Sequence, residues 1–144
     1  MGRFVVVDGH SVLFGIERFR VLLEVNQSAA RDALVRRLEE HQAFGGERLV
    51  VVFDGKGRLT SEDSQGGVQV IFAPSADSAI ERLVARYGGV HALTVVSNDV
   101  MERLTVTAFG AATMSVTDFE RELDRSERLI AREIRRRGPS GRHR

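Results

Sequence analysis

Four aspartates each follow a short apolar segment of this chain. Asp8, Asp54 and Asp99 are the last residues of RFVVVD, RLVVVFD and ALTVVSND, and Asp77 comes four residues after VQVIFA. If the chain brings these carboxylates together, they repel one another, and a bound cation is the usual way to relieve that repulsion. Their placement therefore indicates metal-dependent chemistry.

Hard oxygen ligands and the absence of cysteine favour Mg²⁺ or Mn²⁺ over zinc. A carboxylate-bound Mg²⁺ keeps several waters and accepts phosphate oxygens, so phosphodiester hydrolysis is the reaction that follows most directly. We expect Asp8, Asp54 and Asp99 to bind the metal and Asp77 to complete the catalytic set. The competing interpretation is structural, because Asp is also common in turns and at helix N-termini.

Polar neighbours of these aspartates are candidates for supporting roles. His10 either contacts substrate or starts the first helix, and Ser11 either caps that helix or binds a phosphate. Ser97 and Asn98 either orient a metal-bound water or are ordinary polar residues of a loop. The remaining histidines have no metal-ligand spacing in the sequence, and we assign no function to His41, His91 or His143.

The elements that must position these residues alternate between strands and helices. The strands are continuously apolar, which is typical of parallel strands covered by helices on both faces, and this predicts an α/β sandwich. We expect helix 28–43 to begin after Ser28 as N-cap, with Leu34, Leu38 and His41 or Gln42 along one side. The predicted strands are 3–8, 48–54, 68–73, 92–99 and a weaker 112–116; the predicted helices are 11–24, 28–43, 77–87, 99–109 and one from Asp118 onward.

Ligands of an open parallel sheet bind beyond the carboxyl ends of its strands. All four aspartates are predicted at that edge. If the second and fourth strands flank the first, Asp8, Asp54 and Asp99 lie on neighbouring strands about 5 Å apart. The carboxylates would then converge on one site.

Composition excludes several classes of protein. The 144 residues fit one domain, and no apolar run approaches the roughly 18 residues of a membrane span. The chain has no cysteine and no secretion signal at its start, so we expect a cytoplasmic protein in a reducing compartment.

Positive charge is concentrated near the C-terminus. Residues 125–144 contain eight Arg and two Glu, a local net charge of +6, and residues 1–124 carry −5. Arg binds phosphate bidentately, so this helix is a candidate to contact RNA, although a solvated terminal helix has the same pattern. We expect the contacts from Arg132, Arg135, Arg136 and Arg137, and a disordered basic tail over residues 138–144.

The ordered set of motifs resembles the YacP-like branch of the NYN domains, which belong to the PIN-like nucleases. The resemblance is carried by VVVDGHSVLF, ARDALVRRLEEHQAFGGERLVVVFDG, VQVIFAPSADSAIERLV and LTVVSNDVMERLTVTAFGAATMSVTDF. It implies a three-layer PIN-like (Rossmann-like) sandwich with a central parallel sheet of order 3-2-1-4-5, in one domain over residues 1–137. It also implies an acidic Mg²⁺ or Mn²⁺ site at Asp8, Asp54, Asp77 and Asp99, and cleavage of RNA in messenger RNA decay or RNA processing, with messenger RNA or the ribosome as partner.

One departure from the family pattern affects the site. The family usually has tyrosine and asparagine after the first Asp-Gly, and this chain has His10 and Ser11. A serine lacks the amide that can hold a metal water, so the alternative to a nuclease is a weak or inactive RNA-binding adaptor on the same fold. The segment VVFDG at 51–55 also suggests a dehalogenase-type phosphatase, but that chemistry needs an Asp where Lys56 stands.

Overall fold

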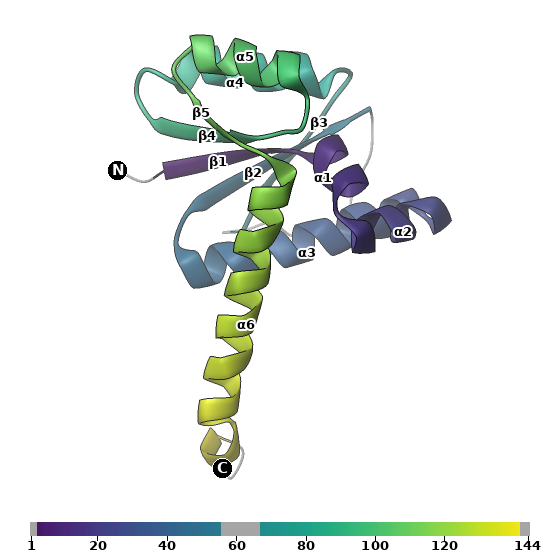
Figure 1. The fold of residues 1–144 in the computed structure, drawn as a ribbon, viewed down its shortest axis with the longest axis vertical. Coiled ribbons are helices and arrows are strands. Elements are labelled where there is room, and N and C mark those ends of the chain that lie inside the picture. Colours follow the sequence, from purple (N-terminus) through teal and green to yellow (C-terminus); the bar gives the residue numbers. More distant parts are fainter. Residues whose placement is uncertain (1–2, 56–66, 142–144) are drawn as a thin grey trace.

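The protein folds around a five-stranded parallel sheet. The computed structural model describes residues 3–55 and 67–141. Within them the strand order is β3-β2-β1-β4-β5, so β1 lies between β2 and β4, and the α/β class and the order expected from the resemblance are confirmed (Figure 1). The strands are β1 (Arg3–Asp8), β2 (Arg48–Asp54), β3 (Gln69–Ala73), β4 (Ala92–Val96) and β5 (Ala112–Met114).

Each central strand contributes to two cores, one on each face of the sheet. Along β1, Val5 and Val7 enter one core and Val6 enters the other. Successive side chains of a strand point to opposite faces, so a strand covered on both faces must be apolar at every position. That is the physical reason for the continuous apolar runs in the sequence.

Helices cover both faces of the sheet (Figure 1). α4 (Ala76–Tyr87) and α5 (Val100–Ala108) lie together on one face. α1 (Gly9–Gly15), α2 (Glu17–Val25) and α3 (Gln27–Gly45) lie on the other, together with the first half of α6 (Val116–Gly141). No helix in the described part of the chain is both long enough and apolar enough to cross a membrane.

The helix predicted for residues 11–24 is two helices. They meet at Ile16, whose extended backbone (φ −107°, ψ 121°) interrupts the helical hydrogen bonds. Ile16 is only 1% exposed, so the break lies within the core. The prediction of one helix was therefore wrong at this residue.

Ser28 is not the N-cap of α3. The Asn26 side chain accepts a hydrogen bond from the Ala29 backbone N–H at 2.9 Å, and the helix begins at Gln27. An Asn amide oxygen caps a helix as well as a Ser hydroxyl does, so two adequate caps stood close together in the sequence. The predicted buried side of this helix is confirmed, because Leu34, Leu38 and His41 are buried.

Several other boundaries differ from the predicted ones, among them those of β4, β5 and α6. β4 ends at Val96 and β5 ends at Met114, each earlier than predicted. α6 begins at Val116 instead of near Asp118, because the Ser115 hydroxyl already accepts a hydrogen bond from the Asp118 backbone N–H at 3.1 Å.

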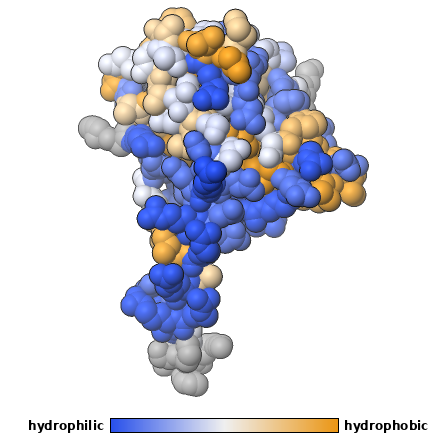
Figure 2. All heavy atoms as spheres, viewed as in Figure 1, coloured by the Kyte–Doolittle hydropathy of each residue, from blue (hydrophilic) through white to orange (hydrophobic). Residues whose placement is uncertain are grey.

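The second half of α6 extends away from the body of the protein (Figure 1). Phe119 and Leu123 are buried near its start, whereas Ile134 is 63% exposed. Figure 2 shows mostly hydrophilic atoms along the extended half. The helix includes residues 138–141 of the segment that the sequence assigns to a tail, and residues 142–144 lie outside the described residues.

Candidate metal centre at the carboxyl edge of the sheet

Asp8 is the most firmly held carboxylate of the site. It is 4% exposed at the end of β1 and is the N-cap of α1, accepting from the backbone N–H groups of His10 at 3.2 Å and Ser11 at 3.5 Å. Its second oxygen accepts from the hydroxyls of Ser11 at 3.1 Å and Ser97 at 3.4 Å. These bonds fix the orientation of the carboxylate. Asp8 is therefore both a helix cap and a preorganised site residue.

Glycine is required directly after Asp8. A Cβ atom built on Gly9 would lie 2.4 Å from an atom of the Phe53 ring and 2.9 Å from the Val52 carbonyl oxygen. Both distances are below any ordinary carbon contact, so a larger residue would push α1 away from β2. The Asp-Gly pair therefore reflects close packing of α1 against β2.

The loop after β4 connects Asp8 to the helices on both sides. The Ser97 hydroxyl also accepts from the Asp99 backbone N–H at 3.0 Å, and the Asn98 backbone N–H donates to the Ser11 hydroxyl at 3.2 Å. The Asn98 side-chain oxygen accepts from the Val116 backbone N–H at 3.0 Å at the start of α6. Ser97 and Asn98 thus support the site through these bonds; their predicted action on a metal-bound water stays a prediction.

Three carboxylates from three different elements come together here. One oxygen from each of Asp8, Asp77 and Glu102 lies within 4.8 Å of the other two. They come from β1, the first turn of α4 and the first turn of α5. Asp8 and Asp77 were predicted from the sequence, whereas Glu102 was missed.

Glu102 is the most unusual of the three. It is 2% exposed, and neither carboxylate oxygen has a hydrogen-bond partner among the described residues. Burial raises the pKa of Glu102 to about 9; the nearby Ser97 hydroxyl lowers it, and the charges of Asp8 and Asp77 raise it further. A buried carboxylate without a partner must either keep a proton or gain a cation.

Asp77 is the exposed member of the cluster. Partial desolvation and then the charge of Asp8 raise the pKa of Asp77, an interaction with Glu102 lowers it, and Asp99 and Asp54 raise it again. Asp77 does not cap α4, because the Ser75 hydroxyl accepts from the Ser78 backbone N–H at 3.2 Å. Asp77 is thus not the N-cap of α4, which was the structural alternative that the sequence left open.

Asp54 and Asp99 lie at the same edge of the sheet, and each accepts a backbone hydrogen bond with one of its carboxylate oxygens. Oδ1 of Asp54 accepts from the Ala76 backbone N–H at 2.8 Å at the start of α4. Oδ1 of Asp99 accepts from the Glu102 backbone N–H at 3.2 Å as the N-cap of α5. Both act electrostatically on Asp77, so they belong to the acidic surroundings of the cluster. Their predicted role as metal ligands stays a prediction.

The other predicted residues divide between this edge and α6. His10 is exposed in the first turn of α1, with its ring centroid 4.5 Å from that of Phe14. Arg136 and Arg137 pair with Glu133 at 2.9 and 3.1 Å. Arg132 and Arg135 make no ion pair with any described residue and are exposed. The acidic cluster and the basic helix are thus separate features.

Glu102 could have been found from its helix face. Glu102 and Val106 are one turn apart on α5, and both are buried. A carboxylate on an apolar helix face is unusual and indicates a site. The spacing Asp99-x-x-Glu102 hides the signal, because an acidic residue three positions after an N-cap is also typical of a capping box.

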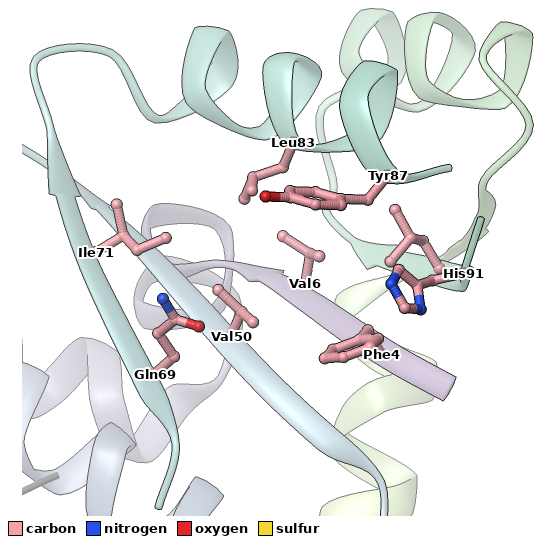
Figure 3. A pocket seen from close by; sticks show the side chains of 9 residues that line it. Phe4, Val6, Val50, Gln69, Ile71, Leu83, Tyr87 and His91 are labelled. Atoms are coloured by element: carbon pink, nitrogen blue, oxygen red, sulfur yellow. The ribbon is translucent and has the colours of Figure 1, made fainter. Parts of the chain in front are cut away.

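The apolar pocket under α4 is not this site. It has a volume of about 230 Å³ and is lined by Phe4, Val6, Val50, Gln69, Ile71, Leu83, Tyr87, His91 and Leu93. Figure 3 shows Leu83 and Tyr87 of α4 above Val6 and Val50 of the sheet. The pocket contains no carboxylate and lies toward the amino ends of the strands.

The donor set fits a hard divalent cation. It consists of carboxylate oxygens from three elements, one of them buried without a hydrogen-bond partner, which a cation would satisfy. A 3-2-1-4-5 parallel sheet with acidic residues at its carboxyl edge is the arrangement that the resemblance to the PIN-like nucleases implies.

The chain belongs to the YacP-like NYN domain family, whose model matches residues 5–144. It is 30% identical over 138 residues to the protein YacP of Bacillus subtilis (strain 168), an alignment that covers 91% of this chain and 81% of that protein.

Two solved structures are similar to this one. The crystal structure of Rae1 (YacP) from Bacillus subtilis has 29% sequence identity and a TM-score of 0.83, covering 96% of this chain and 84% of that one. The structure of its W164L mutant has 28% identity and a TM-score of 0.79, covering 92% of this chain and 81% of that one.

Proposed function

We propose that this protein is a metal-dependent endoribonuclease that hydrolyses phosphodiester bonds of RNA. The observation that carries the proposal is the cluster of Asp8, Asp77 and Glu102, in which one buried carboxylate has no hydrogen-bond partner within residues 3–55 and 67–141. RNA as the substrate rests on membership of the NYN family. The setting that we propose is messenger RNA decay or RNA processing in the cytoplasm.

Asp8, Asp77 and Glu102 would hold the ion, with Mg²⁺ or Mn²⁺ favoured by an all-oxygen donor set. When bound, such an ion polarises a phosphate oxygen and lowers the pKa of a coordinated water. Asp8 offers a carboxylate that Ser11 and Ser97 already hold in place. Preorganised groups of this kind need little rearrangement when charge develops during the reaction.

The remaining carboxylates, Asp54 and Asp99, act on solvent at the edge of the cluster. Asp54 and Asp99 each keep one oxygen that has no hydrogen bond to a described residue. We assign these free oxygens to water molecules around the phosphate, in keeping with the placement of both residues at the edge of the cluster.

The arginines of α6 supply affinity for the RNA backbone. Arg132 and Arg135 are exposed and make no ion pair with any described residue, so they can bind phosphate without first losing a partner. Arg136 and Arg137 share Glu133. The net charge of −5 over residues 1–124 repels RNA from the body, which makes a basic extension useful for capture.

RNA cleavage with matched variants tests the proposal. Purified protein is incubated with single-stranded and structured RNA in Mg²⁺, Mn²⁺ or chelator, beside Asp77→Asn and Glu102→Gln. We expect metal-dependent cutting that falls roughly a hundredfold or more in both variants. Asp118→Asn is the control, because Asp118 forms only an exposed pair with Arg121 and contributes little to stability. Cutting that persists in chelator would exclude the mechanism.

Asp99→Asn separates capping from chemistry. Asn is as good an N-cap as Asp, so this variant keeps α5 capped and removes only the negative charge. Loss of cutting in a variant of unchanged stability would place Asp99 in the reaction. Unchanged cutting would restrict Asp99 to its structural role.

An RNA-binding adaptor is the second candidate. It is favoured by Ser11, whose hydroxyl is occupied by Asp8 at 3.1 Å and the Asn98 backbone N–H at 3.2 Å. The adaptor predicts RNA binding without cutting under every metal condition. Its binding would weaken in Arg132→Glu and Arg135→Glu but not in Asp77→Asn.

A further inference from the structure

A second group of ligand-type side chains lies at the opposite edge of the sheet. One ligand atom from each of His41, Glu47 and Glu122 lies within 4.8 Å of the other two. Glu47 directly precedes β2, and Asp54 ends that strand, so the two edges are separated by roughly 20 Å at about 3.3 Å per residue. This group is therefore distinct from the carboxylate centre.

Ser126 fixes which nitrogen of the His41 ring is available. The Ser126 hydroxyl donates to the Leu123 carbonyl oxygen at 3.0 Å and accepts from an Arg37 N–H at 2.9 Å. Because the Leu123 carbonyl oxygen can accept the single hydroxyl proton, we assign the 2.8 Å bond between Ser126 and Nδ1 of His41 to donation by Nδ1–H. Nε2 is left with a lone pair.

The surroundings of His41 favour the neutral form of its ring. Its ring is 9% exposed and packs edge-on against Phe119, with ring centroids 6.3 Å apart. Burial, followed by the positive charge of Arg37, lowers the pKa of His41, and Glu47 opposes this shift. A neutral imidazole is the form that binds a metal.

Nε2 of His41 has no hydrogen-bond partner among the described residues. His41, Glu47 and Glu122 line the same pocket, which has a volume of about 350 Å³. Because Nδ1 is engaged on the Ser126 side, Nε2 is the nitrogen left for a ligand in this pocket. A ring that is nine-tenths buried, with one nitrogen anchored and the other free, is the arrangement of a metal-binding histidine.

The two glutamates add opposite charge to this nitrogen. Glu47 pairs through Oε2 with Arg3 at 3.1 Å, which leaves its other oxygen available. Burial and then the charge of Glu47 raise the pKa of Glu122, and Arg3 and Arg125 lower it. The carboxylates therefore repel one another despite the nearby arginines, and a cation between them would relieve the repulsion.

We propose that His41, Glu47 and Glu122 form a second metal site, for a first-row transition ion of the Zn²⁺ type. One imidazole and two carboxylates with an open fourth position suit such an ion better than Mg²⁺, which prefers oxygen ligands alone. The site joins α3, the start of β2 and α6. Metal binding would therefore fasten α6 to the body of the protein.

Zn²⁺ binding to the full chain tests this site. The chain carries Glu102→Gln, which weakens the carboxylate centre, and is titrated with Zn²⁺ by calorimetry and by ¹H–¹⁵N NMR of the histidine rings. We expect one binding event that moves the His41 Nε2 resonance. Adding Glu122→Gln should weaken Zn²⁺ binding tenfold or more, since even outer partners of metal ligands contribute roughly tenfold or more.

Glu120→Gln is the matched control. It lies on the same helix and outside the cluster, and we expect it to leave Zn²⁺ affinity unchanged. Glu47→Gln provides a second ligand variant, should Glu122→Gln alter the packing of α6. The site is excluded by Zn²⁺ binding that leaves the Nε2 resonance in place, by equal affinity in the ligand variants and the control, or by no binding at millimolar Zn²⁺. None of these outcomes depends on RNA cleavage.

Discussion

Glu102→Gln should stabilise the metal-free protein at neutral pH. Glu102 is 2% exposed and has no hydrogen-bond partner in the described part of the chain, and its pKa is raised to about 9 from 4.5 in an ordinary carboxyl. The folded state therefore holds its proton more tightly than the unfolded state does between these values. Stability contributed by this group is fully present below about pH 4.5 and falls as pH rises toward 9. Glutamine has nearly the same shape and no charge to lose.

The size of the effect follows from the pKa. Each pH unit in this window costs about 1.4 kcal/mol when only the unfolded state releases the proton. Between pH 5.5 and 7.5 the wild type thus loses at most about 3 kcal/mol of its free energy of unfolding through Glu102. Side-chain relaxation and water entry reduce this loss. We expect Glu102→Gln to gain about 1 to 3 kcal/mol over the wild type across this interval. That corresponds to roughly 3 to 10 °C in Tm for a chain of this size.

Thermal and urea unfolding in chelator at pH 5.5 and 7.5 measure this gain. Glu120→Gln is the control, because its wild-type carboxyl has no place in the cluster. Addition of Mg²⁺ or Mn²⁺ should then raise the Tm of the wild type and have a smaller effect on Glu102→Gln. The reasoning is refuted if wild type and variant lose the same stability between the two pH values. Equal stabilisation of both by metal would remove Glu102 from the ion site.

Three further perturbations test other parts of the structure. Gly9→Ala should cost about 1 to 3 kcal/mol through overpacking and reduce RNA cutting, and unchanged urea unfolding would contradict this. Ser126→Ala should cost about 1 to 3 kcal/mol, because buried Arg37 loses a hydrogen-bond acceptor; a stable variant would show that another group replaces it. Arg132→Glu with Arg135→Glu should flatten the dependence of log affinity for RNA on log salt by about 1 to 2 units, and an unchanged slope would place the contacts elsewhere.

The positions of the strands could be predicted from the sequence because burial on both faces requires a continuous apolar run, whereas their order was expected from the resemblance to the NYN domains. Val5, Val6 and Val7 are apolar in succession only because each has a core to enter. The break at Ile16 could not be predicted in the same way. An apolar residue fits either a continuous helix or a kink, and packing against the rest of the protein decides between them.

Candidate site residues could be predicted where they end a strand of the sheet or closely follow one. Asp8 and Asp77 stand at strand ends or in the turn after one, where the sheet rule points. Glu102 lies inside a helix, and the packing of α5 against α4 brings it into the cluster with Asp8 and Asp77. His41 was assigned no function for a similar reason, because Glu47 and Glu122 are 6 and 81 positions away from it and no local spacing connects the three.

The structure of the carboxylate centre explains why its members differ in how they can respond to a ligand. Asp8 is fixed by four hydrogen bonds and by the close packing of Gly9, so it cannot move without disturbing β1 and α1. Asp77 is exposed on the first turn of α4 and can adjust. Neither carboxylate oxygen of Glu102 has a hydrogen-bond partner among the described residues. A cation would therefore bind one rigid ligand, Asp8, one adaptable ligand, Asp77, and one buried carboxylate, Glu102. Burial of the Glu102 charge is costly until the cation is bound. Metal binding should therefore also stabilise the folded protein through Glu102.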